Sequence, residues 1–173
     1  MVLFEKTLDE KSIYKGKIID IVVQNIELPN GRISKREIVK HPGGVAILAY
    51  LDDETVLFVE QFRKPIDNCI LELPAGKLEY GENTKECGIR ELEEETGYKA
   101  KKFEYLGKIV TSPGFCNEYI YIYKASDLYK GQTGLGDEDE FINIHEIKVN
   151  DIKAMIKKGD IIDSKTICAF MMI

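Results

Sequence analysis

The sequence lacks the features that mark thiolate metal sites, membrane proteins and nucleic-acid binders. Its four cysteines form no C-x-x-C pair, which argues against a zinc site. No apolar run approaches the roughly 20 residues of a membrane-spanning helix, and the first residues do not resemble a signal peptide. The net charge of −6 gives no basic field for nucleic acid or anionic membranes. We therefore expect a cytoplasmic protein with reduced thiols, no nucleic-acid partner and no membrane partner.

Histidine and cysteine catalysis also have little support. The only histidines are His41 and His145, and neither lies in a partner motif. Cys116 has no visible base nearby, so we do not expect it to be a nucleophile. What the chain does have is 173 residues and 44% hydrophobic residues, enough for the core of one domain. An acidic protein of this kind can bind a phosphate-containing substrate if divalent cations invert the local field.

Hydrophobic patterning predicts strands around one central helix. Residues 18–26 and 34–39 are expected to pair as a hairpin through the Pro-Asn-Gly turn at 28–32. We expect residues 1–40 to form an N-terminal β-hairpin arm, either a separate small sheet or a dimerisation element, and residues 41–173 to form the main domain. The central helix is expected at 84–96, with Asn83 as N-cap and Gly97 at C′. Further strands are predicted at 45–51, 55–62, 70–73, 103–111, 118–125 and 141–147, and helices at 149–158 and 164–173. This order gives an α+β or α/β sandwich.

Three glutamates share one face of the central helix. Glu91 and Glu95 are four residues apart, and Glu91 and Glu94 are three apart. Like charges at these spacings destabilise a helix in water, and a bound divalent cation removes that cost because hard cations take oxygen ligands. Taken alone, such a run is more often a solvated acidic surface than a metal site.

The residues around the helix favour the metal site. Residues 76–98 match the pattern G-x5-E-x7-R-E-U-x-E-E-x-G-U, in which U is an apolar residue. The fixed positions are Gly76, Glu82, Arg90, Glu91, Glu94, Glu95 and Gly97. Seven such identities would arise by chance about once in a million chains of this length. The segment 76–98 resembles the signature of the Nudix hydrolase family, with Tyr98 as the one softer match, since an aliphatic residue is more usual there.

The resemblance implies a fold and a metal site. The fold would be α/β: a Nudix-type α/β/α sandwich with a mixed sheet and a small N-terminal antiparallel sheet. The metal would be Mg²⁺, with Mn²⁺ as a possible substitute, and its implied ligands are Ala75 (through its carbonyl), Glu91, Glu94 and Glu95. The metals would polarise a diphosphate and activate a water. Arg90 is a fixed cation that would orient the carboxylates for catalysis, and Glu82 could pair with it.

Three further segments resemble the ADP-ribose pyrophosphatase branch of that family. They are 60–64 with 71–77, 112–118, and the acidic stretch 136–141. The branch implies hydrolysis of ADP-ribose to AMP and ribose 5-phosphate by a homodimer that exchanges N-terminal strands. It favours Glu138 as the general base on a mobile lid, with Glu140 as an extra metal ligand or substitute base. The expected substrate-binding residues are Arg36, Arg63, Ser112, Gly114 and Glu118.

Other functions are compatible with the same segment. Fold and signature alone do not separate ADP-ribose from GDP-mannose, another nucleotide sugar or an oxidised nucleoside. A non-catalytic binding module on this fold should lose one or more metal carboxylates, and here all are present. An unrelated acidic surface helix would predict no metal dependence at all.

Overall fold

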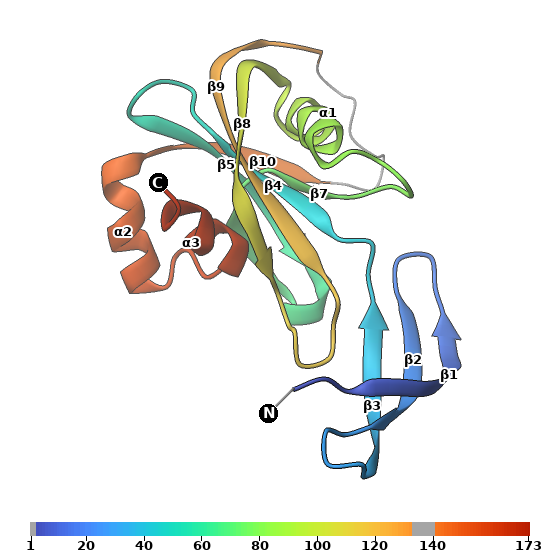
Figure 1. Cartoon of the computed structure of the whole chain (residues 1–173). Coiled ribbons are helices and arrows are strands. Elements are labelled where there is room, and N and C mark those ends of the chain that lie inside the picture. The colour runs from blue at the N-terminus through green and yellow to red at the C-terminus, as the bar shows by residue number, and fades with distance from the viewer. Residues whose placement is uncertain (1–2, 133–140) are drawn as a thin grey trace. The chain divides into compact units, whose positions relative to one another are not determined.

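The computed structural model describes residues 3–132 and 141–173 (Figure 1). Its strands are β1 (Lys6–Lys15), β2 (Asp20–Glu27), β3 (Ile33–Lys40), β4 (Gly44–Ala49), β5 (Thr55–Arg63), β6 (Asn68–Glu72), β7 (Ala75–Lys77), β8 (Tyr98–Val110), β9 (Tyr119–Lys130) and β10 (Ile142–Lys148). Its helices are the 3-10 turn η1 (Lys64–Ile66) and the α-helices α1 (Thr84–Thr96), α2 (Val149–Lys158) and α3 (Ser164–Phe170). In the part of the chain described, no helix is long and apolar enough to cross a membrane.

The chain divides into two compact units. The first comprises Met1–Gly43 and Val110–Tyr119, and the second comprises Gly44–Ile109 and Ile120–Ile173.

The first unit contains a three-stranded antiparallel sheet in the order β1-β2-β3. The expected turn between β2 and β3 is present, with Gly31 at φ 79° and its N–H bonded to the carbonyl of Leu28 at 2.8 Å. The predicted hairpin was incomplete, because β1 pairs along β2 as a third strand. All ten residues of β1 are exposed, so no apolar alternation marks it in the sequence. Backbone pairing and cross-strand contacts hold it instead, such as Asn25 Nδ2 to Asp9 Oδ1 at 2.9 Å.

The second unit is a sandwich with helices on both sides of its sheets (Figure 1). The mixed sheet has the order β7-β4-β9-β8, in which β4 runs parallel to β9 and antiparallel to β7. A second, antiparallel sheet has the order β10-β5-β6. Every residue of β4 is buried, and its side chains alternate between two cores. Ala46 and Leu48 pack with residues of α2 and α3, whereas Val45 and Ile47 pack with residues of α1. This arrangement confirms the predicted α/β/α sandwich with a mixed sheet.

Several predicted boundaries in the second unit were wrong. β8 begins at Tyr98 rather than at residue 103, because Gly97 adopts a left-handed conformation (φ 69°) and turns the chain directly from helix to strand. β9 extends to Lys130, five residues past the predicted end of that strand at residue 125. α3 ends at Phe170, three residues before the predicted end. Chain ends and strand extensions depend on tertiary pairing, which local patterning does not report.

Candidate active site

The central helix α1 has the predicted bounds and caps. The side chain of Asn83 accepts a hydrogen bond from the backbone N–H of Lys85 at 2.9 Å, and the N–H of Gly97 donates to the carbonyl of Glu93 at 2.8 Å. The buried residues of the helix are Cys87, Gly88, Leu92 and Thr96. Because this apolar stripe fixes the rotation of the helix, the glutamates of the signature lie away from the core.

Arg90 lies at the centre of the acidic cluster. Its Nε is 3.1 Å from Glu82, and its Nη1 is 2.9 Å from Glu91 and 2.8 Å from Glu94. Partial burial alone would lower the pKa of Arg90, but the hydrogen bonds to Glu82 and the charge of Glu91 raise it. The same bond from Arg90 lowers the pKa of Glu82. The structure therefore shows the expected Arg90–Glu82 pair, and shows Arg90 binding two of the predicted metal carboxylates.

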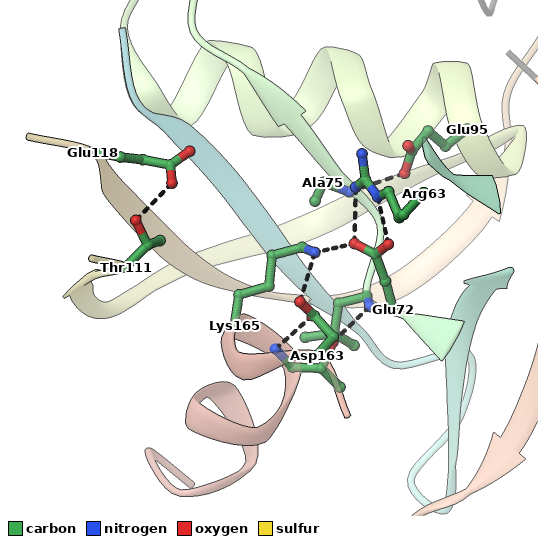
Figure 2. Close-up of polar contacts among 10 residues, drawn as sticks. Arg63, Glu72, Ala75, Glu95, Thr111, Glu118, Asp163 and Lys165 are labelled. Carbon is green, nitrogen blue, oxygen red and sulfur yellow. Dashed lines mark hydrogen bonds and ion pairs between the residues drawn. The ribbon is translucent and has the colours of Figure 1, made fainter. Parts of the chain in front are cut away.

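The turn after β6 brings Ala75 and Gly76 against this helix. The N–H of Ala75 donates to Glu95 Oε2 at 2.9 Å (Figure 2). A Cβ atom on Gly76 would lie 1.8 Å from the carboxylate carbon of Glu91. Only glycine leaves room for that carboxylate, which explains the first fixed position of the signature on steric grounds.

These residues suit a hard divalent cation by their chemistry. Their donors are all oxygens, namely carboxylates from one helix face and the adjoining backbone of Ala75. Among residues 3–132 and 141–173, no three His, Cys, Asp or Glu side chains are already gathered as a metal-binding group. Instead, a positive Arg90 nitrogen lies within 2.9 Å of the carboxylates of Glu91 and Glu94. The Glu91 and Glu94 carboxylates thus bind a positive charge at the position where metal ions are expected.

Arg63, an expected phosphate ligand, lies at the end of β5 in a paired state. Its Nε and Nη2 donate to the two carboxylate oxygens of Glu72 at 2.6 and 2.8 Å (Figure 2). The Arg63 side chain is 41% exposed, whereas that of Glu72 is 1% exposed. One edge of the guanidinium is therefore fixed by a buried carboxylate, and the side chain still reaches solvent.

Arg36, in the first unit, is also paired. Its Nε donates to Glu5 at 3.0 Å, and Nη2 forms a second bond to the same carboxylate. The Arg36 side chain is 39% exposed, so, like that of Arg63, it reaches solvent while it is paired.

Glu118, Ser112 and Gly114 belong to the loop before β9, also in the first unit. Thr111 Oγ1 donates to Glu118 Oε2 at 2.7 Å (Figure 2). The carbonyl of Ser112 accepts from the N–H of Cys116 at 2.9 Å and so closes a turn. A Cβ on Gly114 would meet nothing within 4 Å, so its backbone faces open space.

Both histidines have acidic partners that sequence reasoning missed. His41 Nδ1 is 3.2 Å from Glu118 Oε1 and also accepts from the N–H of Gly43 at 3.0 Å. His145 Nε2 is 3.2 Å from Glu60. These partners are distant in sequence, so no local motif announced them. Glu138 and Glu140, the expected general base and its substitute, lie outside the described residues.

Comparison with known proteins decides the family. The NUDIX domain model matches residues 40–170. The chain belongs to the NUDIX hydrolase family. A second model, the nucleoside diphosphate sugar hydrolase N-terminal domain, matches residues 5–39. The resemblance inferred from the signature is thereby confirmed.

Curated relatives of this NUDIX protein match along nearly its whole length. It is 46% identical over 166 residues to the ADP-ribose pyrophosphatase of Bacillus subtilis, covering 95% of this chain and 89% of the relative. It is also 46% identical to the methanol dehydrogenase activator of Bacillus methanolicus, covering 95% and 90%. A crystal structure of an ADP compounds hydrolase matches 97% of this chain and 91% of its own with a TM-score of 0.85. At 20% identity, that likeness shows a shared fold.

Proposed function

We propose that this NUDIX protein hydrolyses the diphosphate bond of ADP-ribose to give AMP and ribose 5-phosphate. Water would attack one phosphorus, the bridging P–O bond would break, and the water proton would pass to a base. The observation that carries the proposal is the Arg90-centred carboxylate cluster of α1 beside Ala75 and Gly76. The 46% identity to an ADP-ribose pyrophosphatase supports this substrate.

We assign Mg²⁺, with Mn²⁺ as a substitute, to Glu91, Glu94, Glu95 and the carbonyl of Ala75. When bound, the metal would polarise the diphosphate and lower the pKa of the attacking water. The chain's own contribution is placement: Gly76 leaves space for Glu91, and the N–H of Ala75 orients Glu95.

The remaining site residues are proposed in two groups. Glu138, with Glu140 as the alternative, is the proposed base. The proposed substrate ligands are Arg63 for a phosphate, Glu118 for the ribose or in support of the metal site, and Arg36, Ser112 and Gly114 for further contacts. The exposure of Arg63 and the loop positions of Glu118 and Gly114 support this grouping.

We also propose that residues 1–40 form a dimerisation arm and residues 41–173 the hydrolase domain of a cytoplasmic homodimer. The exposed strand β1 supports a role in pairing, since it carries apolar side chains at Leu8 and Ile13. The four free cysteines, Cys69, Cys87, Cys116 and Cys168, are consistent with a reducing compartment.

The substrate can be tested with a panel of diphosphates assayed with Mg²⁺. ADP-ribose should give the highest kcat/KM, ahead of GDP-mannose and an oxidised nucleoside diphosphate. If ADP-ribose were turned over no faster than the other members, the substrate assignment would be lost while the family assignment stands.

The metal assignment can be tested on the same helix. Glu94→Gln and Glu95→Gln should each lower Mg²⁺-dependent kcat by about 100-fold, because a neutral amide replaces a charged ligand of the metal. Glu86→Gln is the matched control, since Glu86 lies in the first turn of α1 and is exposed. Full activity in either site variant would contradict the assignment.

The relative named as a methanol dehydrogenase activator favours a second candidate function, action on a dehydrogenase. Adding the wild type and the Glu95→Gln variant to a methanol dehydrogenase separates the two. If only the wild type activated the dehydrogenase, activation would depend on hydrolysis. If both proteins activated it equally, activation would not depend on the metal site.

A further inference from the structure

Side chains at the start of α3, among them Asp163 and Lys165, lie against Glu72, the last residue of β6 (Figure 2). Lys165 Nζ forms an ion pair with Glu72 and lies 3.1 Å from Asp163 Oδ1. The side chains of Lys165, Asp163 and Glu72 are 12%, 13% and 1% exposed. Charges this far from water are tolerated only when they are paired and hydrogen-bonded. The cluster is therefore a specific structural connection.

Asp163 organises this turn. Its Oδ2 accepts from the backbone N–H of Thr166 at 3.0 Å, which caps the helix, and from the Thr166 hydroxyl at 2.6 Å. The hydroxyl oxygen in turn accepts from the backbone N–H of Leu73 at 2.9 Å. The Asp163 carboxylate thus orients Lys165 toward the Glu72 side chain, and Thr166 toward the backbone N–H of Leu73 directly after β6.

The segment from Glu72 to Ala75 is held at each step. The carbonyl of Pro74 accepts from the N–H of Ile47 at 2.8 Å, and the N–H of Ala75 donates to Glu95 at 2.9 Å. Hydrogen bonds therefore hold the backbone that links Glu72 to the partner of Glu95. Since Glu72 holds two nitrogens of Arg63, the same frame positions that guanidinium.

Glu72 has two cationic partners, Arg63 and Lys165, and the second one affects whether Arg63 can bind a phosphate. If Arg63 were the only counterion, a phosphate that drew its charge away would leave a buried carboxylate uncompensated, which is costly. With Lys165 in place, the carboxylate keeps a counterion while Arg63 binds a phosphate.

We propose that Lys165 is a positioning residue for substrate binding, which shares the charge of Glu72 and so leaves Arg63 oriented and available for the diphosphate. This inference rests on the proposed function, because it requires Arg63 to contact the substrate. A merely structural lysine predicts a different result: its loss would reduce the amount of folded enzyme, and so the apparent kcat, and would leave KM unchanged.

The test is the kinetics of Lys165→Met and Lys165→Arg. Lys165→Met should raise KM about tenfold, the lower end of what loss of an outer-shell partner costs. Its kcat per folded enzyme and its half-saturating Mg²⁺ concentration should stay near the wild-type values. Lys165→Arg, which keeps the charge, should return KM toward wild type. Lys102→Met is the control, since Lys102 forms an exposed ion pair with Asp127 at 3.0 Å. An unchanged KM in Lys165→Met would overturn the proposal.

A double-mutant cycle asks whether Lys165 acts through Arg63. In an Arg63→Met background, Lys165→Met should add little to KM, whereas additive effects would contradict the proposal. If Lys165→Met did not fold, Lys165→Gln would replace it in the cycle and be judged by the same two criteria. All variants are assayed on the diphosphate that the wild type hydrolyses fastest. A failure of the ADP-ribose assignment is thereby distinguished from a failure of the Lys165 proposal.

Discussion

At the residue scale, Glu72 shows how a buried carboxylate stays ionised. Burial alone would raise its pKa, but the hydrogen bonds from Arg63 and the charge of Lys165 outweigh burial and hold the pKa below its ordinary value of 4.5. A carboxyl whose pKa is lower in the folded than in the unfolded chain stabilises the fold above the unfolded value. That stabilisation is lost as the pH falls through the folded pKa.

The pH dependence of stability should therefore change when Glu72 is replaced. Glu72→Gln should lower the free energy of unfolding by about 3 kcal/mol at pH 7, because two cations lose their buried partner. The difference from wild type should narrow as the pH falls below the ordinary value of 4.5 and through the lowered pKa of the Glu72 carboxyl, because the wild-type side chain is then protonated. Urea unfolding at a series of pH values measures both. The exposed Glu86→Gln variant is the control, and a difference that stays constant with pH would contradict the prediction.

At the element scale, α1 combines stabilising ends with an unfavourable face. The Asn83 side chain caps the N-terminus of the helix, and Gly97 in a left-handed conformation terminates it. Between them, Glu91, Glu94 and Glu95 repel one another, and Arg90 offsets part of this repulsion by binding two of the three. The caps therefore matter for stability more than they would in a helix with complementary charges.

Removing the N-cap should destabilise the protein measurably. Asn83→Ala should cost about 1 kcal/mol, because the N–H of Lys85 loses its acceptor. Asn83→Asp is the matched variant, since it keeps a side-chain acceptor and should stay close to wild type. Circular dichroism during urea unfolding reports the difference. Equal stability of the Ala and Asp variants would argue that tertiary packing alone fixes this end.

At the scale of the whole molecule, the N-terminal sheet is the proposed dimerisation arm. β1 has register shifts at Leu8 and at Ile13, and these apolar side chains are 45% and 55% exposed. Burying such side chains against a second copy of the chain would stabilise a dimer.

The expected mass in solution is that of a dimer, about twice 19.7 kDa, or 39.4 kDa, by light scattering at micromolar concentration. The double substitution Leu8→Asp with Ile13→Asp should shift the mass toward 19.7 kDa, because it places charge at the proposed interface. Ile162→Asp, at a residue 53% exposed in the second unit, should not. A wild-type monomer would remove the proposal.

The sequence alone determined the helix α1 and the carboxylates on its face, because both depend on interactions between residues close in the chain. Helix caps act over two to four residues, and the i, i+3 and i, i+4 spacings place Glu91, Glu94 and Glu95 on one face whatever surrounds them. The β2–β3 turn was likewise predictable, because the turn needs a residue with positive φ and Gly31 adopts that conformation without steric cost.

Only the tertiary structure decided the contacts between distant segments. Lys165 and Glu72 are 93 positions apart, and nothing near either residue in the sequence signals the other. β1 was missed because its residues are all exposed and its order comes from pairing with β2. The positions of Arg63 and Glu72, and the acidic partners of both histidines, follow from how strands and helices meet. Long-range packing sets those distances, which a periodicity or a motif does not encode.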